Sequence, residues 1–194
     1  VTETRRPGPV DDSDEALMLR AGTGDRWACQ LLVERHLGWI VGFAQRMLGN
    51  RSDAEDAAQD VFVRVWSNAP RWKPQAARFT TWLYRVAMNV CLDRIAKKRE
   101  VPADDLPEPS DPRPEPSAVL LASDLARHVS AALTKLPDAQ RIAVTLCHYQ
   151  GLRNSEAAEV MNVSVEALES LLARARRALR AHLRPLAPAL LEGA

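Results

Sequence analysis

The sequence predicts an all-α protein that consists of two small helical domains. Apolar residues in both halves of the chain recur three and four positions apart, the spacing that places side chains on one face of an α-helix. No segment alternates apolar and polar residues convincingly, and no Asn-Gly hairpin signal occurs. Six prolines lie among acidic residues between positions 102 and 116, and they separate the two halves because neither a helix nor a central strand can continue through them.

The proline-rich segment sets the expected domain boundaries. Proline restricts the backbone and the acidic side chains repel one another, so an extended, flexible linker is predicted. The expected order is a disordered acidic and polar segment at 1–12, a first domain at 13–99, the linker at 100–122, a helix-turn-helix domain at 123–184 and a tail at 185–194.

The first domain is expected to contain a series of helices. Three helical patterns open it, at about 13–22, 26–35 and 37–48. Apolar residues at 54–66 then follow helix spacing without a miss, and Ser52 with Glu55 is typical of a capping box at a helix start. A loop rich in Pro and Trp at 67–77 leads to another helix. The core-facing side chains of this last helix are expected to be Trp82, Leu83, Val86, Ala87, Val90 and Ile95, and its opposite stripe Arg85, Asn89, Asp93 and Lys97.

The second domain is expected to contain four helices, of which the first two prepare the helix-turn-helix. Ser123 is the expected cap of the first, which carries apolar residues as far as Leu136. The second is predicted at 138–149, with Pro137 in its first turn, where the missing N–H costs little, and Gly151 after its end.

The last two helices form a helix-turn-helix pattern. A short helix at about 155–161, with Asn154 as its cap, is followed by the turn at 162–164 and a long basic helix at about 165–183 with Ser164 as its cap. Two helices joined by three residues, the second of them basic, are typical of duplex DNA binding. The residues expected where the two helices meet are Ala157, Ala158, Val163 and Leu168.

The composition is that of a packed protein outside the membrane. Of the 194 residues, 46% are hydrophobic and 26% are charged, so packed domains are expected rather than global disorder. No run approaches the roughly 18 consecutive apolar residues of a membrane-spanning helix. The polar residues 1–15 lack the apolar centre of a secretory signal, and three distant cysteines give no disulfide framework. We therefore expect a cytoplasmic protein without membrane insertion.

The formal net charge of +1 hides strong local differences. Residues 71–99 hold eight basic side chains against one acidic, whereas residues 100–118 hold six acidic against one basic. Five arginines follow between positions 174 and 184. Two basic zones separated by an acidic spacer suggest two contacts with a polyanion, although solvated helix faces produce the same pattern.

Two motifs in the first domain resemble bacterial sigma factors. The run at 53–62 resembles the acidic helix of these proteins that docks on core RNA polymerase. The run at 79–89, followed by Asp93-Arg94 and by the basic run at 97–99, resembles the helix that melts the promoter and reads its −10 element.

A third motif, in the second domain, completes the resemblance. Leu136-Pro137, Gly151-Leu152 and a helix-turn-helix that ends with Arg174-Ala175-Arg176 are similar to the sigma domain that reads the −35 element. The order of the motifs and the short linker resemble the extracytoplasmic-function (ECF, group IV) class, which keeps only these two domains. The match covers roughly residues 13–184.

By this resemblance, the chain is an alternative sigma factor that binds core RNA polymerase, directs it to specific promoters and helps to open the −10 region. The resemblance also implies contacts with the beta and beta-prime subunits, with promoter DNA and with an anti-sigma factor, in a stress or envelope response. Docking would use the coiled coil of beta-prime. The candidate polymerase contacts, unless they are an ordinary solvated helix face, are Asp56, Gln59, Asp60, Val63 and Arg64.

Opening a duplex requires cations for phosphates and flat side chains for unpaired bases, and residues 71–99 contain both. By resemblance, the loop at 72–77 would hold a flipped base, while Trp82 and Phe79 are expected to lie at least half in the core. The candidate contacts to the separated −10 strand are Trp72, Lys73, Arg78, Trp82, Arg85, Asn89, Lys97 and Lys98.

The long basic helix departs from the commonest ECF pattern. Glu169 and Leu171 stand where ECF sigma factors often carry a lysine and an arginine, so the −35 sequence is expected to differ. The candidate −35 contacts are Arg153, Asn154, Ser164, Glu166, Glu169, Ser170, Arg174 and Arg177.

Two other functions are compatible with parts of the sequence. A stand-alone helix-turn-helix transcriptional regulator would bind duplex DNA without polymerase, but it does not explain the basic and aromatic stretch. An enzyme is disfavoured because there is no Gly-rich phosphate loop and no metal-spaced His/Cys cluster. Cys147 and His148 diverge by about 100° on one helix, which favours packing over catalysis. We expect no cofactor, metal or catalytic residue.

Overall fold

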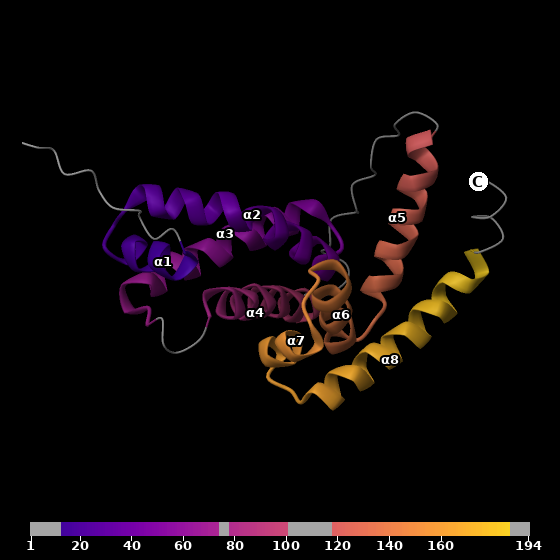
Figure 1. Cartoon of the computed structure of the whole chain (residues 1–194). Helices are drawn as coiled ribbons and strands as arrows, with labels where there is room; N and C mark the ends of the chain where they lie inside the picture. The colour runs from indigo at the N-terminus through magenta and orange to yellow at the C-terminus, as the bar shows by residue number, and fades with distance from the viewer. Residues whose placement is uncertain (1–12, 74–77, 101–117, 187–194) are drawn as a thin grey trace, which may run out of the picture.

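The computed structural model describes residues 13–73, 78–100 and 118–186 of the 194-residue chain. All regular structure in these ranges is helical, which confirms the predicted fold class (Figure 1). The first bundle comprises α1 (Asp14–Gly22), α2 (Arg26–Leu48), α3 (Arg51–Asn68) and α4 (Phe79–Glu100), with a 3₁₀ turn at Ala69–Arg71. The second bundle comprises α5 (Ala118–Thr134), α6 (Asp138–Val144), α7 (Asn154–Met161) and α8 (Val165–Leu183), with a π-helical turn at Thr145–Tyr149 and a 3₁₀ turn at Arg184–Leu186.

Helix α2 corrects two of the predicted elements. The patterns at 26–35 and 37–48 belong to one helix of 23 residues, which starts after the capping side chain of Asp25. No proline interrupts it, and His36 and Ile40 continue one buried stripe across the expected break. A single long helix therefore spans the first bundle.

The junction between α2 and α3 is set by a glycine and an asparagine. Gly49 has a φ of 86°, the left-handed conformation that commonly ends a helix. The side chain of Asn50 then accepts a hydrogen bond from the backbone N–H of Asp53 at 2.8 Å. The cap of α3 is thus Asn50, and the prediction of Ser52 was wrong because Ser52 lies inside the first turn.

The second bundle begins earlier than predicted. Helix α5 starts at Ala118, so residues 118–122, expected to belong to the linker, are helical, and Ser123 lies inside the helix instead of capping it. The proline-rich residues 101–117 lie outside the described residues. Pro137 is the N-cap of α6 rather than a residue of its first turn.

The helix-turn-helix is confirmed by α7, α8 and the three-residue turn at 162–164. Asn162 has a positive φ of 54° and ends α7. Ser164 caps α8, because its hydroxyl accepts a hydrogen bond from the backbone N–H of Ala167 at 3.2 Å. The two helices therefore have a fixed relative orientation.

Two details of the helix-turn-helix differ from the prediction. The N-cap of α7 is Arg153, whose backbone N–H donates to the Glu156 carboxylate at 2.9 Å, so Asn154 is the first helical residue and not the cap. Val163 remains 38% exposed in the turn, while the other residues expected between the helices are buried: Ala157, Ala158 and Leu168.

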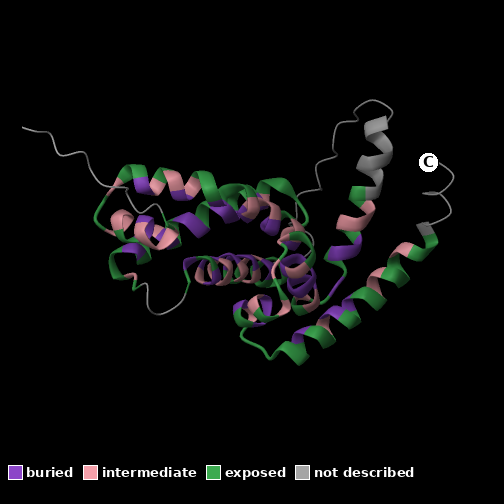
Figure 2. Cartoon of the chain, viewed as in Figure 1, coloured by how far each residue is buried: buried purple, intermediate pink, exposed green. Residues whose placement is uncertain are grey.

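The two bundles pack against each other, α2 against α5 and α4 against α7 (Figure 1). The buried side chains consequently form one continuous core. Figure 2 shows that the buried positions of the first bundle lie between its helices, whereas α8 is exposed along most of its length. Of the predicted core residues of α4, Trp82 and Val86 are only half-buried, and the buried ones are Leu83, Ala87, Val90 and Ile95.

Candidate nucleic-acid and polymerase interfaces

The outward side of α3 carries three of the side chains predicted to contact polymerase. Asp56, Gln59 and Val63 are exposed, and Val63 keeps 61% of its surface accessible. The opposite side of the helix is buried and consists of Ala54, Ala57, Ala58, Val61 and Val65. The three exposed side chains are thus available to a partner without any change in the core.

The other two predicted polymerase contacts form ion pairs with α4. Asp60 Oδ2 lies 2.6 Å from Nη2 of Arg94, and Nη2 of Arg64 lies 2.8 Å from Oδ2 of Asp93. Both pairs are partly exposed, and such pairs contribute at most about 1 kcal/mol each to stability. They connect α3 to α4, and Asp60 and Arg64 remain exposed at the edge of the α3 surface.

A third ion pair joins Asp53 of α3 to Lys98 of α4. Burial raises the pKa of the Asp53 carboxyl, but hydrogen bonds from Lys98 and from the Asn50 side chain outweigh this effect and hold the pKa below its ordinary value. Lys98 was predicted to contact the −10 strand, and in the free chain its ammonium group is bound to α3 instead. The three ion pairs together connect the α3 surface to the helix that carries the predicted −10 contacts.

The aromatic residues at the start of α4 form a packed cluster. The ring centroids of Trp72 and Trp82 are 4.9 Å apart, and Phe79 contacts both rings at 5.8 and 5.9 Å. Phe79 is 1% exposed, whereas the two tryptophans are half-buried, which confirms the expectation that Phe79 and Trp82 lie at least half in the core. Lys73 beside the cluster is exposed, and residues 74–77 of the predicted base-binding loop lie outside the described residues.

Helix α1 supports the start of α4 through contacts that the sequence analysis missed. The backbone N–H of Phe79 donates to the Glu15 carboxylate at 2.9 Å. Trp39 Nε1–H donates to Nδ1 of the buried His36, so His36 carries its proton on Nε2 and donates to Asp14 at 2.9 Å. This hydrogen bond, reinforced by Arg35, lowers the pKa of Asp14 although burial opposes it. An acidic pair at a helix start is the only local signal of this arrangement.

The basic and polar stripe of α4 is divided between solvent and the second bundle. Asn89 and Lys97 are exposed, as predicted for residues that contact DNA. Arg85 is half-buried, and its Nη2 donates to the backbone carbonyl of Glu159 in α7 at 2.6 Å. Burial raises the pKa of the neighbouring Tyr84 to about 12. Part of the predicted −10 surface thus faces protein rather than solvent.

The helix-turn-helix keeps its predicted contact residues at the surface. Asn154 is half-buried and donates to the Glu169 carboxylate at 3.3 Å, while Arg174 donates to the backbone carbonyl of Ser170 at 3.3 Å. Backbone N–H donation at the start of α8, aided by Ser164, lowers the pKa of Glu166. The exposed members of the predicted set are Arg153, Ser164, Glu166, Glu169, Ser170, Arg174 and Arg177.

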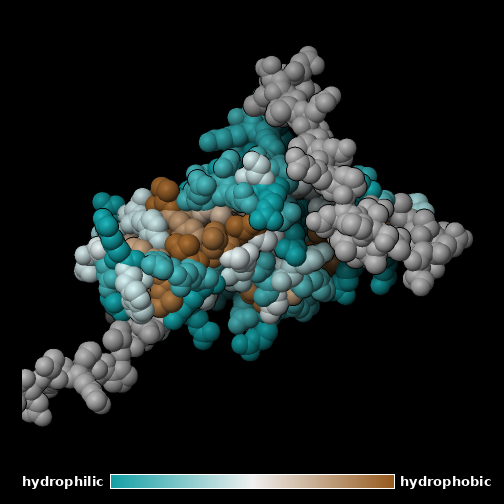
Figure 3. Space-filling model, turned by 90° about the horizontal axis from the view of Figure 1, so that it is seen from above, coloured by the Kyte–Doolittle hydropathy of each residue, from teal (hydrophilic) through white to brown (hydrophobic). Residues whose placement is uncertain are grey.

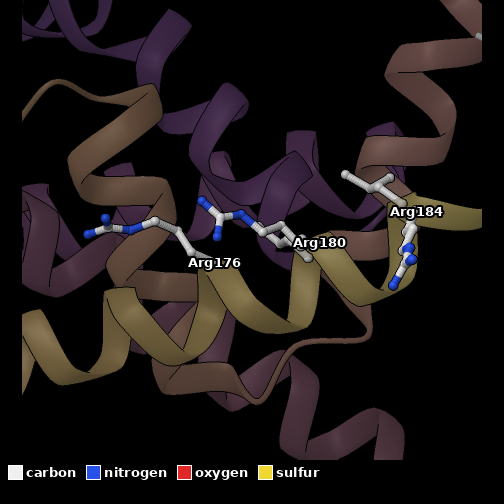
Figure 4. Close-up of a pocket in the computed structure, with 5 residues that line it drawn as sticks. Arg176, Arg180 and Arg184 are labelled. Atoms are coloured by element: carbon white, nitrogen blue, oxygen red, sulfur yellow. The ribbon is translucent and has the colours of Figure 1, made fainter. Parts of the chain in front are cut away.

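An arginine-lined hollow of about 570 Å³ lies along the C-terminal half of α8 (Figure 4). It is lined by Leu179 and Leu183 and by three arginines, Arg176, Arg180 and Arg184. The sequence analysis identified the arginines but not the two leucines that line the hollow with them. Its chemistry fits an apolar segment that carries acidic residues.

The remaining surface contains an apolar region on the first bundle. On the face seen in Figure 3, apolar side chains gather over that bundle, and α2 exposes Trp27 and Leu37. Among the described residues, no group of three or more His, Cys, Asp or Glu side chains is placed to hold a metal ion. None of the described helices is both long and apolar enough to span a membrane.

Comparison with known proteins accounts for both bundles. A family model described as Sigma-70 region 2 matches residues 32–101, and one described as Sigma-70, region 4 matches residues 127–179. The chain is 32% identical to the ECF RNA polymerase sigma factor SigE of Mycolicibacterium smegmatis, over 90% of this chain and 70% of that protein. It is 31% identical to the ECF sigma factor SigW of Bacillus subtilis, over 84% of this chain and 92% of that protein.

A solved structure extends the similarity to three dimensions. The structure of CnrH in complex with the cytosolic domain of CnrY superposes with a TM-score of 0.68 and 29% identity, and covers 89% of this chain and 97% of that one. The similarity therefore includes both bundles and not only the helix-turn-helix. Together with the relatives of known class, it confirms the resemblance found in the sequence: the chain belongs to the ECF class of RNA polymerase sigma factors.

Proposed function

We propose that this alternative sigma factor holds core RNA polymerase with the exposed side of α3, reads the separated −10 strand with α4 and reads the −35 duplex with α8. The observation that carries this assignment is the separation of three surfaces with different chemistry on one chain. The α3 surface is polar and acidic around an apolar residue, α4 presents an amide and cations, and α8 presents arginines on a helix-turn-helix. The stand-alone regulator has no support among the relatives, which are sigma factors.

Two surfaces are suited to two polymerase subunits. The exposed Asp56, Gln59 and Val63 of α3 combine charge, an amide and an apolar group, which suits the coiled coil of beta-prime. The arginine-lined hollow on α8 combines two leucines with three arginines, which suits an acidic, apolar segment of the beta subunit. Contacts on both bundles would fix the spacing of the two DNA-reading helices.

The two DNA surfaces differ in the state of DNA that they suit. Asn89 has free amide donors and acceptors for a base edge and Lys97 an ammonium group for phosphate, as required by an exposed strand. Arg174 and Arg177 lie on α8, the second helix of the helix-turn-helix, which is the helix that would enter a major groove. Glu169 on the same surface can accept a hydrogen bond from a cytosine amino group and repels phosphate, so it favours a −35 sequence that differs from the common one.

Regulation by an anti-sigma factor is the third part of the proposal. The related CnrH is known in complex with the cytosolic domain of CnrY. This chain shares its fold over both bundles and exposes an apolar region on the first bundle and an arginine-lined hollow on the second. An anti-sigma factor that covers either surface would compete with polymerase.

Run-off transcription tests the proposed function. Core polymerase with and without this chain is supplied with a library of genomic promoter fragments, and the transcripts are sequenced. We expect start sites that share two spaced elements and appear only when the chain is present. If core polymerase alone produces the same transcripts in the same amounts, the proposed function is wrong.

A further inference from the structure

An asparagine at the start of the helix-turn-helix connects its two helices. Asn154 is the first residue of α7, and its Nδ2–H donates to the Glu169 carboxylate of α8 at 3.3 Å. Helices α7 and α8 pack against each other, so this hydrogen bond crosses the junction of the motif (Figure 1). The Glu169 side chain is therefore held from α7, in the first half of the helix that is proposed to enter the major groove.

The oxygen of the same amide faces the π-helical turn that precedes α7. The Cys147 thiol donates to Oδ1 of Asn154, with Sγ and Oδ1 3.9 Å apart. Burial raises the pKa of this thiol, so it keeps its proton at neutral pH and can act as the donor. A donor at the amide oxygen and an acceptor at the amide nitrogen together determine which way the amide points.

The side chain of Asn154 is not required to start α7. The backbone N–H of Arg153 donates to the Glu156 carboxylate at 2.9 Å, and this contact belongs to the cap of the helix. Alanine and aspartate are both compatible with the first turn of a helix. The contact with Glu169 can therefore be removed without removing the cap of α7.

The chemistry of a fixed carboxylate favours one base in the major groove. A carboxylate only accepts hydrogen bonds, and cytosine presents a donor there, its N4 amino group. Guanine presents two acceptors, N7 and O6, which a carboxylate repels. Glu169 is exposed, and one of its oxygens is held by Asn154. Because this hydrogen bond limits the rotamers of a long side chain, less conformational entropy is lost when the other oxygen binds a base.

A second carboxylate, that of Glu166, is exposed on the same helix. It accepts from a backbone N–H at the start of α8 and from the Ser164 hydroxyl, and both contacts lower its pKa. Its interactions are thus with the start of its own helix. Glu169 instead interacts with the other helix of the motif, and it stands where ECF sigma factors often carry a lysine.

We propose that Asn154 and Glu169 act as one unit that selects cytosine at one position of the −35 element. Glu169 contacts the base, because one of its oxygens accepts a hydrogen bond from the cytosine amino group. Asn154 is a positioning residue, which holds the other oxygen. This inference rests on the proposed function for the assignment of α8 to the −35 duplex.

Initiation from randomised promoters tests this unit in the holoenzyme. Core polymerase with the full chain is supplied with a library in which the −35 element of one mapped promoter is randomised and the rest is kept, and the transcripts are counted by sequencing. At one −35 position, cytosine should give about fivefold more initiation than guanine on the same strand, the low end of the discrimination that a base contact provides. Glu169→Ala should abolish this preference.

The variants of Asn154 separate positioning from a direct contact. Asn154→Ala should reduce the cytosine preference by about twofold, as expected for the loss of a weak hydrogen bond. Asn154→Asp keeps the shape but repels Glu169, so the reduction should be larger. In the Glu169→Ala background, Asn154→Ala should cause no further change in this preference. Ser155→Ala, at the exposed next position of α7, is the matched control and should keep the preference of the parent chain.

Three results would overturn the inference: a cytosine preference that persists in Glu169→Ala, its loss in Glu166→Gln alone, or equal effects of Asn154→Ala with and without Glu169. The same experiment reports on the proposed function separately. If transcripts depend on the chain but no −35 position favours cytosine, the inference fails and the proposed function stands. If core polymerase alone gives the same transcripts, the proposed function fails and the inference fails with it.

Discussion

Helices α4 and α8 are both proposed to read DNA, yet the free chain treats them differently. Three basic side chains of α4 have partners within the protein, whereas Asn89 and Lys97 are exposed: Arg85 binds α7, Lys98 binds Asp53, and Arg94 binds Asp60. The polar side chains of α8 proposed to contact DNA are exposed, and within the described part of the chain Arg174 donates a hydrogen bond to the Ser170 carbonyl of its own helix. The difference shows that a helix rich in basic residues is not necessarily free to bind DNA. Availability depends on what the rest of the chain places against it.

The largest expected effect is a loss of stability when the packing at the start of α4 is removed, compared with a change in the turn of the helix-turn-helix. Phe79→Ala should destabilise the protein by about 3–5 kcal/mol, because the ring is buried between Trp72, Trp82 and His36. Urea unfolding followed by circular dichroism measures this change. Val163→Ala, in the exposed turn before α8, is the control and should change stability by less than about 0.5 kcal/mol. A small effect of Phe79→Ala would mean that the start of α4 is held by other contacts.

Replacing Asn89 tests whether α4 reads a base. Asn89→Ala should lower discrimination at the opened −10 element by about 1–3 kcal/mol through the loss of a base contact. The measurement is open-complex formation on a promoter that carries a mismatched bubble at the −10 region. The defect should persist on this template because the proposed contact is to the exposed strand. Full rescue by the bubble would instead assign Asn89 to melting or packing.

Charge reversal on α3 tests the polymerase surface without touching either DNA helix. Asp56→Lys should weaken binding of core polymerase by about 1–2 kcal/mol, because the exposed carboxylate lies at the proposed contact. The fold should be unchanged by circular dichroism. The same substitution at Asp60 also breaks its ion pair with Arg94, so the comparison of the two variants separates docking from the α3–α4 connection. Undiminished binding by a folded Asp56→Lys variant would remove α3 from the interface.

Replacing Arg174 tests whether α8 contacts a phosphate of duplex DNA. Arg174→Ala should weaken duplex binding at every sequence and reduce the slope of log affinity against log salt by about 0.9, the value for one phosphate contact. Titration of a duplex promoter fragment at several salt concentrations provides this slope. An unchanged slope with altered sequence preference would indicate that Arg174 contacts a base.

The smallest expected effect concerns how the stability of the protein decreases at acidic pH. The pKa of Asp14 is lowered in the folded chain from its ordinary value of 3.8, so its carboxylate contributes stability above about pH 4, and this contribution is lost as pH falls further. In Asp14→Asn, stability should decline less steeply below pH 4 than in the parent chain. Thermal unfolding between pH 3 and pH 7 measures both curves. Parallel curves would show that Asp14 does not carry this dependence.

Sequence reasoning identified the elements that depend on local signals. The turn at 162–164, the Ser164 cap and the exposed stripe of α3 follow from residue types a few positions apart, and all three are present in the structure. The break in α2 was wrongly predicted because a window of ten residues cannot distinguish two helices from one when no cap or proline lies between them. The prediction that Val163 packs where the two helices meet was wrong, because the geometry of the turn and not the apolar side chain decides how exposed this residue is.

The partners of the candidate residues could not be predicted in the same way. Arg85 and Glu159 are 74 positions apart, and Asp60 and Arg94 are 34 apart, so their contacts depend on how helices pack and not on any local pattern. The sequence does not distinguish a lysine or arginine that is free from one that forms an ion pair or a hydrogen bond within the protein. For this reason the sequence indicated Arg85 as a candidate −10 contact but did not indicate that its guanidinium binds the Glu159 carbonyl of α7.

Hydroxyl-radical footprinting on one mapped promoter, with its −10 region held open by mismatches, tests the difference between α4 and α8 most directly. The free chain should protect the −35 duplex more strongly than the open −10 strand, because three basic side chains of α4 are paired within the protein. Addition of core polymerase should extend full protection to both elements. Protection of the open −10 strand by the free chain, equal to its protection of the −35 duplex, would contradict the distinction between an α4 whose basic side chains are partly paired and an α8 whose arginines are exposed.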